Sequence, residues 1–306
     1  MSGEATLPPG GAAPAAGPAA DETERAGASR RFIRRFASNR LAVGALAVLT
    51  VMIAASALAP WIAPYRMDAI DMAHRLSGPT ALHWLGTDSL GRDTLTRLLW
   101  GGRTSLSAAV LAVTVATVIG VPFGLIAGYF GGRIDWLLSR AADVLMTFPP
   151  LILAIAIIAA TGPGLITAMT AIGVVYAPRL FRVTRGATLS VRAETYIEAS
   201  VSIGSPAHRI IATRVLPNIL SPLLVQISLM LAAALLAEAA LSLLGLGVVP
   251  PTPSWGNILG RGFLEIRSTP QLMIWPGLTI ALATLSFNLL GDGLRDALGR
   301  EIRKGD

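Results

Sequence analysis

The sequence predicts an all-α integral membrane protein, and three observations support this prediction. Hydrophobic residues make up 53% of the 306 positions, only 14% are charged, and the mean hydropathy is +0.62. Soluble domains contain about a quarter charged residues. Six apolar runs are close to the roughly 20 residues that a helix needs to cross a bilayer. The chain is therefore expected to cross the lipid bilayer six times.

The apolar runs follow an N-terminal region without hydrophobic periodicity. Residues 1–29 are rich in Ala, Gly and Pro and are expected to form a disordered cytoplasmic tail. The basic residues 30–40 lead into a first run that starts too late and is too long for a cleaved signal peptide. Pro149 and Pro150 interrupt the third run, so this helix is expected to be broken or kinked. The expected spans are residues 41–62, 104–130, 142–161, 164–181, 217–246 and 272–291.

The positions of arginine and lysine predict the orientation. If the N-terminus is cytoplasmic, 18 of the 25 basic residues lie on that side and seven lie outside. The positive-inside rule therefore favours cytoplasmic N- and C-termini. It also places a polar segment of about 35 residues, from about 182 to 216, in the cytoplasm. The expected regions are the tail (1–29), a lead-in with the first span and an outer segment (30–103), a transmembrane domain (104–300) and a second cytoplasmic tail (301–306).

The polar segment before the fifth span contains the sequence signals of two short helices joined by a turn. Gly204 can close a first helix in the left-handed conformation. Ser205 can cap a second helix, and Pro206 suits its first turn. Pro217 then begins the next apolar run. A folded hairpin at this position indicates a docking surface, although any long loop can form two short helices without a partner.

At these positions the chain resembles a known pattern. The motif EAA-x3-G-x9-I-x-LP of importer-type ABC transporter permeases is matched by Glu198, Ala199, Gly204, Leu216 and Pro217. Ser200 replaces the second alanine of the motif, and Arg214 replaces its isoleucine. In that family the segment forms coupling helices that sit in a cleft of the ATP-hydrolysing subunit. The resemblance implies ATPase-coupling roles for the matched residues, above all for Glu198 and Gly204.

Three further stretches resemble the dipeptide/oligopeptide/nickel branch of these permeases. They are HWLGTDSLGRDTLTRLLWGGR from His83, PPTPSWGNIL from Pro250 and LLGDGLRDALG from Leu289. The resemblance covers residues 32–300 and implies the second permease subunit of a type I importer, which translocates di- or oligopeptides across the bacterial plasma (inner) membrane. Nickel or another small solute stays an alternative cargo. The implied partners are ATP-binding cassette ATPase subunits, a second homologous permease and an extracytoplasmic solute-binding protein.

Several classes of function are disfavoured by what the sequence lacks. Lys304 is the only lysine, so a GxxxxGK[ST] phosphate loop is impossible; if ATP powers this protein, another chain must bind it. Cysteine is absent, and His74, His83 and His208 have no ligand spacing, so neither a metal nor a cofactor is expected. We find no catalytic set, so the chain is not expected to be an enzyme. The net charge of +7 reflects loop arginines, and no nucleic acid is expected as a partner.

Glu238 is an ionisable residue within the fifth apolar run. A carboxylate there costs roughly 2.5–3.5 kcal/mol at a helix centre, so it is expected to face protein or water. It is a candidate for pathway lining or subunit contact, and the alternative is a satisfied structural carboxylate. A stand-alone secondary transporter, the rival from another class, would need such groups, and Glu238 is the one clear candidate.

Two predictions concern charged residues near the ends of the spans. Asp143 is three residues beyond Arg140 and is expected to form an ion pair with it. In the outer segment, Leu95, Leu98 and Leu99 predict an amphipathic helix. The charged groups beside that helix are expected to stay in water; they are Arg92, Asp93 and Arg97.

Overall fold

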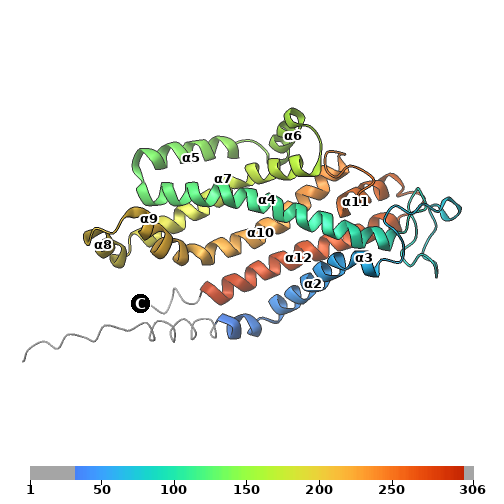
Figure 1. Ribbon diagram of the computed structural model, residues 1–306, viewed down its shortest axis with the longest axis horizontal. Coiled ribbons are helices and arrows are strands. Elements are labelled where there is room, and N and C mark those ends of the chain that lie inside the picture. Colours follow the sequence, from blue (N-terminus) through green and yellow to red (C-terminus); the bar gives the residue numbers. More distant parts are fainter. Residues whose placement is uncertain (1–31, 300–306) are drawn as a thin grey trace, which may run out of the picture.

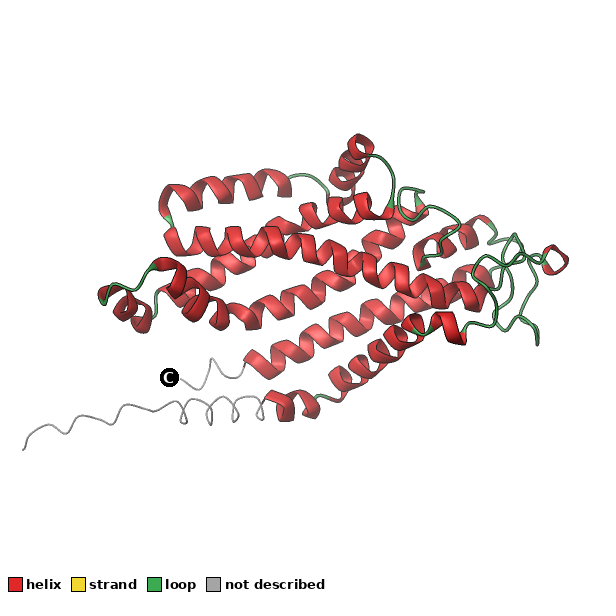
Figure 2. Cartoon of the chain, viewed as in Figure 1, coloured by secondary structure: helices red, strands yellow, loops and turns green. Residues whose placement is uncertain are grey.

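The computed structural model describes residues 32–299, which form helices joined by loops, with no β-strand among them (Figure 1, Figure 2). The tails expected at 1–29 and 301–306 lie outside the described residues. Residues 32–38 are helical, and the helices that follow are α2 (Arg40–Ala57), α3 (Ala59–Ile62), η1 (Met72–His74), α4 (Thr94–Phe130), α5 (Gly132–Met146), α6 (Pro150–Thr161), α7 (Leu165–Arg192), α8 (Thr195–Ser202), α9 (Ala207–Ile210), η2 (Ile211–Val215), α10 (Leu216–Leu243), α11 (Trp255–Leu264) and α12 (Gln271–Gly299).

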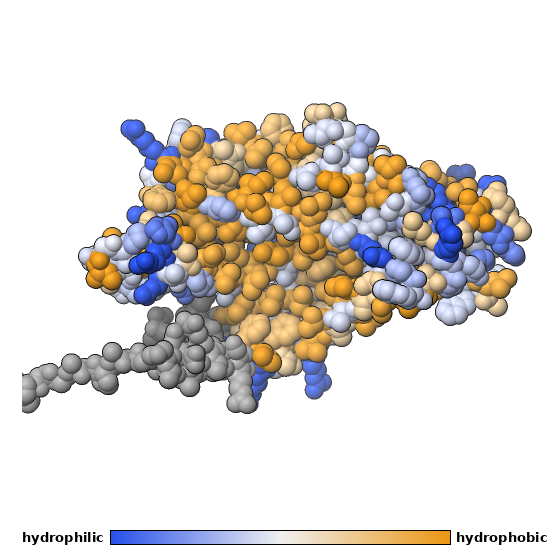
Figure 3. All heavy atoms as spheres, in the orientation of Figure 1, coloured by the Kyte–Doolittle hydropathy of each residue, from blue (hydrophilic) through white to orange (hydrophobic). Residues whose placement is uncertain are grey.

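The long helices lie side by side and form a multi-pass membrane bundle (Figure 1). Within residues 32–299, five helical stretches are long and apolar enough to cross a bilayer, and the bent pair α5–α6 gives a sixth. Figure 3 shows hydrophobic side chains over the middle of the molecule and hydrophilic ones gathered toward its two ends. We call the end with α8 and α9 the hairpin end, and the end with residues 63–93 and α11 the loop end. The predicted all-α membrane fold is confirmed.

The third expected span is a bent pair of helices. Helices α5 and α6 meet at 91°, with Pro149 and Pro150 at the break. Pro150 is the first residue of α6, a position that needs no amide donor. The predicted break is confirmed. The expected bounds 142–161 are wrong, because the first part of that run belongs to α5, which begins at Gly132.

Close approach of small residues holds α4 against α7. Gly120, Gly124 and Gly128 recur every fourth position and so lie along one face of α4. A Cβ atom added at Gly124 would lie 2.6 Å from Cβ of Thr184, and one added at Gly128 would lie 2.6 Å from Cβ of Thr188. Small residues at this spacing let membrane helices pack backbone to backbone. Helix α7 is therefore held along α4 as far as the hairpin end.

Two long helices continue beyond the expected ends of the fourth and fifth spans. Helix α7 was expected to end at residue 181 and instead runs to Arg192. At the other side of the hairpin, α9, η2 and α10 form one continuous helical stretch from Ala207 to Leu243. The polar segment expected from about 182 to 216 therefore contains the last part of α7 and the helices α8, α9 and η2. Its first part is helical because α5 packs beside it and supplies carboxylates to its arginines.

Two ion pairs join α7 to α5. Nη2 of Arg182 lies 2.7 Å from Oδ1 of Asp143, and Nη2 of Arg185 lies 2.7 Å from Oδ2 of Asp135. The predicted pair between Asp143 and Arg140 is wrong, because Arg182 on the neighbouring helix takes that carboxylate. A surface pair within one helix contributes only about 0.2–0.5 kcal/mol and is easily replaced by such an arrangement.

The charged residues beside the second span are buried. Arg92, Asp93 and Arg97 are 4%, 5% and 2% exposed, so the prediction that they stay in water is wrong. Asp88 compensates the arginines: its Oδ2 lies 2.6 Å from Nη2 of Arg92 and 3.7 Å from Nε of Arg97. Burial opposes ionisation of Asp88, but hydrogen bonds from Arg92 outweigh it and lower the pKa of Asp88. Partnered in this way, the charges can lie inside the loop end.

The amphipathic helix predicted in the outer segment is the first part of α4. Asp93 is its N-cap, and the Asp93 carboxylate accepts a hydrogen bond of 2.7 Å from the Thr96 amide. An acidic N-cap satisfies a free amide of the first turn and interacts favourably with the helix dipole. The second span and the outer helix are therefore one continuous element of 37 residues.

Candidate functional site

Helix α8 ends in the glycine turn that the sequence predicts. Gly204 has φ +78°, and its amide donates to the Val201 carbonyl at 2.9 Å. The Ser205 amide donates to the Ser200 carbonyl at 3.1 Å. These are the two hydrogen bonds of a Schellman C-cap, in which glycine takes the left-handed position. The chain reverses here, and α8 lies beyond the ends of the long helices (Figure 1).

The second half of the hairpin differs from the prediction at two positions. Pro206, and not Ser205, is the N-cap of α9, because Ser205 belongs to the turn that closes α8. No break in the helix precedes Pro217. The π-helical turn η2 precedes it, and the Leu216 amide bonds to the Ile211 carbonyl five residues back. This wider turn carries the helix past Pro217, whose own amide donor is missing.

One face of the hairpin is anchored in the bundle. Ile197 and Ile210 are each 2% exposed and belong to the main hydrophobic core, and Leu216 packs against the same core. The Asn218 side chain donates to the hydroxyl of Tyr196 at 3.2 Å and so joins α10 to α8. The hairpin is therefore tied to α10, and a displacement of the one is expected to move the other.

The opposite face of the hairpin is open. Glu198, Ala199, Gly204 and Pro217, four of the five predicted coupling residues, are exposed there or near it. Sequence reasoning did not single out the apolar side chains beside them, Val201 at 55% and Ile203 at 81% exposure. Their position just before the glycine of the turn was the signal that could have identified them. This face combines a carboxylate with exposed apolar side chains, as a docking surface requires.

Glu238 lies away from the hairpin, near the loop end of α10. It is fully buried, and its carboxylate accepts hydrogen bonds from Ser105 at 3.0 Å and from Ser242 at 2.8 Å. The Ser105 hydroxyl in turn accepts from the Trp255 amide at 3.0 Å. The carboxylate thereby links α4, α10 and α11, which favours the satisfied structural carboxylate. A role in the pathway or at a subunit contact stays a prediction.

The histidines are arranged differently from what their spacing indicated. His208 is exposed on α9. His74 and His83, nine positions apart, are brought together at the loop end, where Asp71 lies beside them. This is the group of potential metal ligands found within residues 32–299, and it lies far from the hairpin. Sequence spacing missed the group because a folded loop, and not a helix, assembles it.

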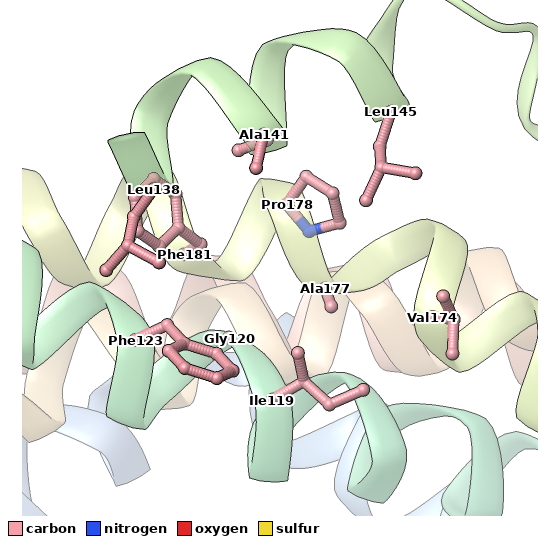
Figure 4. Close-up of a pocket in the computed structure, with 11 residues that line it drawn as sticks. Ile119, Gly120, Phe123, Leu138, Ala141, Leu145, Val174, Ala177, Pro178 and Phe181 are labelled. Carbon is pink, nitrogen blue, oxygen red and sulfur yellow. The ribbon is translucent and has the colours of Figure 1, made fainter. Parts of the chain in front are cut away.

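An apolar cavity of about 220 Å³ lies between α4, α5 and α7 (Figure 4). Phe123 of α4, Leu138 and Leu145 of α5, and Pro178 and Phe181 of α7 are among the residues that line it. Every lining residue is apolar or glycine, so the cavity offers no hydrogen-bonding group to a polar solute. We assign it no role in recognition.

Two family matches and several curated relatives agree on the class of the chain. Residues 120–304 match "Binding-protein-dependent transport system inner membrane component", and residues 28–79 match "N-terminal TM domain of oligopeptide transport permease C". The dipeptide transport system permease protein DppC of Alkalihalophilus pseudofirmus is 41% identical over 90% of each chain. The glutathione transport system permease protein GsiD of Pectobacterium atrosepticum is 40% identical over 90% of this chain and 91% of the relative.

A third relative and a solved structure extend these similarities. The di/tripeptide transport system permease protein DppC of Pseudomonas aeruginosa is 40% identical over 90% of this chain and 92% of the relative. A chain of the MetNI methionine ABC transporter, solved in an inward-facing conformation, has a TM-score of 0.55 and 21% identity, over 68% of this chain and 95% of that one. That likeness supports the fold alone. The chain belongs to the inner membrane components of binding-protein-dependent transport systems, the permeases of ABC importers.

Proposed function

We propose that this permease translocates di- or oligopeptides across the bacterial plasma membrane. The support is the naming of relatives about 40% identical over nine tenths of the chain, which transport dipeptides, glutathione and di- or tripeptides. All these solutes contain peptide bonds. Nickel or another small solute has no comparable support.

The hairpin end is the side on which an ATPase docks, and it is cytoplasmic together with both termini. The single observation that carries this proposal is the exposed face of the anchored hairpin, where Glu198 and Ala199 of the matched motif lie beside Ile203. The ATPase is a separate subunit, since the only lysine, Lys304, cannot form a phosphate-binding loop. The distribution of basic residues supports the orientation.

The complex also contains a second homologous permease and an extracytoplasmic solute-binding protein. The translocation path lies between the two permeases, and the binding protein delivers solute at the loop end. Closure of the ATPases moves the docked hairpin. The movement passes to α10, which continues from α9, and to α7, which is joined to α5 by ion pairs. Alternating access then follows from two states of the bundle that ATP populates differently.

The substitution Gly204→Asp tests the coupling role. We expect normal abundance in the membrane and loss of ATP-dependent peptide uptake, because an added side chain meets nothing within 4 Å but strains the backbone at φ +78° and adds a charge to the docking face. Gly186→Ala is the matched control, since Gly186 is an exposed helical glycine of α7 with nothing within 4 Å of an added Cβ.

Two measurements decide between this proposal and its rivals. Uptake into vesicles with an imposed ion gradient but without ATP would indicate a secondary transporter instead. Mass spectrometry of proteins that co-purify with the tagged chain is expected to recover an ATPase, a second permease and a binding protein. Normal peptide uptake by Gly204→Asp at normal abundance would refute the coupling role.

A further inference from the structure

We propose that Asp71, His74 and His83 at the loop end form a binding site for one divalent transition-metal ion, with Zn²⁺ as the best fit. Each residue offers one ligand atom, and the three atoms lie within 4.8 Å of one another. Around Zn²⁺, ligand atoms at 2.0–2.1 Å are separated by roughly 3.3 Å in tetrahedral geometry. The gap to be closed is therefore about 1.5 Å at most, which rotation of exposed side chains can provide.

A second carboxylate orients His83 as a metal ligand. Nδ1 of His83 lies 3.0 Å from Oδ1 of Asp93, and both side chains are buried. Oδ2 of Asp93 is held by the Thr96 amide at 2.7 Å, so this carboxylate is fixed by the start of α4. A proton on Nδ1 that is donated to Asp93 leaves the lone pair on Nε2. Histidine ligands of metals usually donate their other ring N–H to a carboxylate in this way.

The turn that carries the other two ligands is held in place by its backbone. The Asp71 carboxylate accepts from the Ala73 amide at 3.1 Å, and the Thr87 hydroxyl donates to the His74 carbonyl. The rings of His74 and His83 have centroids 5.9 Å apart. Two separate parts of the loop end, residues 71–74 and 83–94, are thus already adjacent, and an ion would need only side-chain movement.

The remaining two ligands are accessible. Asp71 and His74 are each 45% exposed at the side chain, and they form a hydrogen bond of 2.8 Å between Oδ2 and Nδ1. An ion would replace this hydrogen bond and bring both groups toward Nε2 of His83. Because Asp71 and His74 are partly exposed, water can complete the coordination. The site is therefore open to ions in the surrounding solution.

The donor set selects the kind of ion. Two imidazoles and one carboxylate suit zinc and other late first-row metals, whereas magnesium and calcium prefer oxygen ligands. The ion would cross-link the turn at 71–74 to the loop before α4 and so stabilise the loop end. This site is separate from the proposed docking face, which lies at the other end of the molecule (Figure 1).

Zinc titration of the purified full-length chain tests the proposal. The chain is prepared in detergent without a polyhistidine tag, stripped with chelator and titrated with ZnSO₄ by calorimetry. We expect one Zn²⁺ per chain. His74→Ala and Asp71→Asn should each weaken binding at least ~10-fold, because loss of a group that only orients a metal ligand already costs roughly that much. His208→Ala is the matched control, since His208 is the remaining histidine and lies on the hairpin, and it should bind like the wild type.

A second measurement does not depend on the folding of any variant. X-ray absorption at the zinc edge of the zinc-loaded wild-type chain should show two imidazoles and only nitrogen or oxygen ligands. The proposal is overturned if zinc does not bind saturably at one ion per chain. It is equally overturned if His74→Ala and Asp71→Asn, monodisperse by gel filtration, bind zinc as tightly as His208→Ala, or if the spectrum contains no imidazole.

Discussion

The loop end and the hairpin end each depend on a glycine in the left-handed conformation, but the surroundings of the two glycines differ. Gly91 has φ +71°, and a Cβ added there would lie 1.8 Å from the Asp71 carbonyl oxygen. Gly204 has φ +78°, and an added Cβ would meet nothing within 4 Å. The loop end is thus packed against itself, whereas the tip of the hairpin is free of this chain. The first region specifies its own fold, and the second leaves a surface for another molecule.

Gly91→Ala should have the largest effect on stability. The added methyl group cannot avoid the Asp71 backbone, and the left-handed φ adds about 1–2 kcal/mol of strain. We expect a loss of roughly 4 kcal/mol or more, which few single changes exceed. The measurement is abundance in the membrane together with the Tm of detergent-purified protein.

Gly204→Ala is the matched comparison for that variant. It carries the same kind of backbone strain without a steric clash, so we expect a loss of only about 1–2 kcal/mol and normal abundance. Equal stability of the two alanine variants would contradict the difference between the two ends. The same result would show that the Asp71 backbone yields to the added methyl group.

Glu238→Ala should have the next largest effect on stability, because Glu238 is fully buried near the loop end. Removing the carboxylate leaves the buried hydroxyls of Ser105 and Ser242 without that partner. An unsatisfied buried polar group costs about 1–3 kcal/mol. We expect Tm to fall clearly in Glu238→Ala and much less in Glu238→Gln, which keeps the shape and an acceptor.

Transport by Glu238→Gln separates the two interpretations of this residue. A structural carboxylate predicts that peptide uptake per folded complex stays near the wild-type level. Loss of uptake with an unchanged Tm would instead favour a role in the pathway or at a subunit contact. The two outcomes are read from the same preparation, by thermal unfolding and by vesicle uptake.

The two ends also differ in how far the sequence predicted them. At the hairpin end, the role of Gly204 in closing α8 follows from local backbone preference, and the structure agrees. The prediction that Ser205 caps α9 was wrong, because Ser205 takes part in the glycine turn that closes α8. Local rules could not show that η2 carries the helix past Pro217, since a π-helical turn has no strong sequence pattern.

At the loop end, the sequence predicted the start of α4 but not its surroundings. The leucine pattern near residue 95 predicted a helix, which is present, although the side expected to stay in water is buried. Burial of Arg97 and the approach of His74 to His83 depend on how the loop before α4 folds back on itself. Such long-range contacts leave no periodic pattern in the sequence. The spans themselves were predictable because the bilayer fixes their length and composition.

Acidification should have a smaller effect, and at the loop end it acts on Asp88. The pKa of Asp88 is lowered in the folded chain, so its ion pairs stabilise the fold above the ordinary aspartate pKa of about 4. That contribution is lost as pH falls through the lowered value. The groups facing Asp88 are Arg92, Arg97 and, from α11, Arg261, and all of them keep their charge at these pH values.

The variant Asp88→Asn isolates this contribution. It lacks the titrating carboxyl, so its Tm should be lower than that of the wild type at pH 6. The difference in Tm should shrink as the pH is lowered from 6 to 3, because the wild type loses its ion pairs while the variant has none to lose. A difference that stays constant over this range would mean that Asp88 does not contribute through its charge.

Ile203→Glu should have the smallest effect on stability and a large effect on transport. Ile203 is 81% exposed, and surface substitutions usually change stability by less than about 0.5 kcal/mol. Leu264 at the loop end is 80% exposed and provides the matched control, Leu264→Glu. If the hairpin face docks an ATPase, a carboxylate at position 203 is buried in that interface without a partner, and such burial is costly. Recovery of the ATPase with the tagged chain should then fall for Ile203→Glu and not for Leu264→Glu, at equal Tm. Normal recovery with Ile203→Glu would mean that the exposed apolar tip is not part of the interface, and that docking rests on the Glu198 face alone.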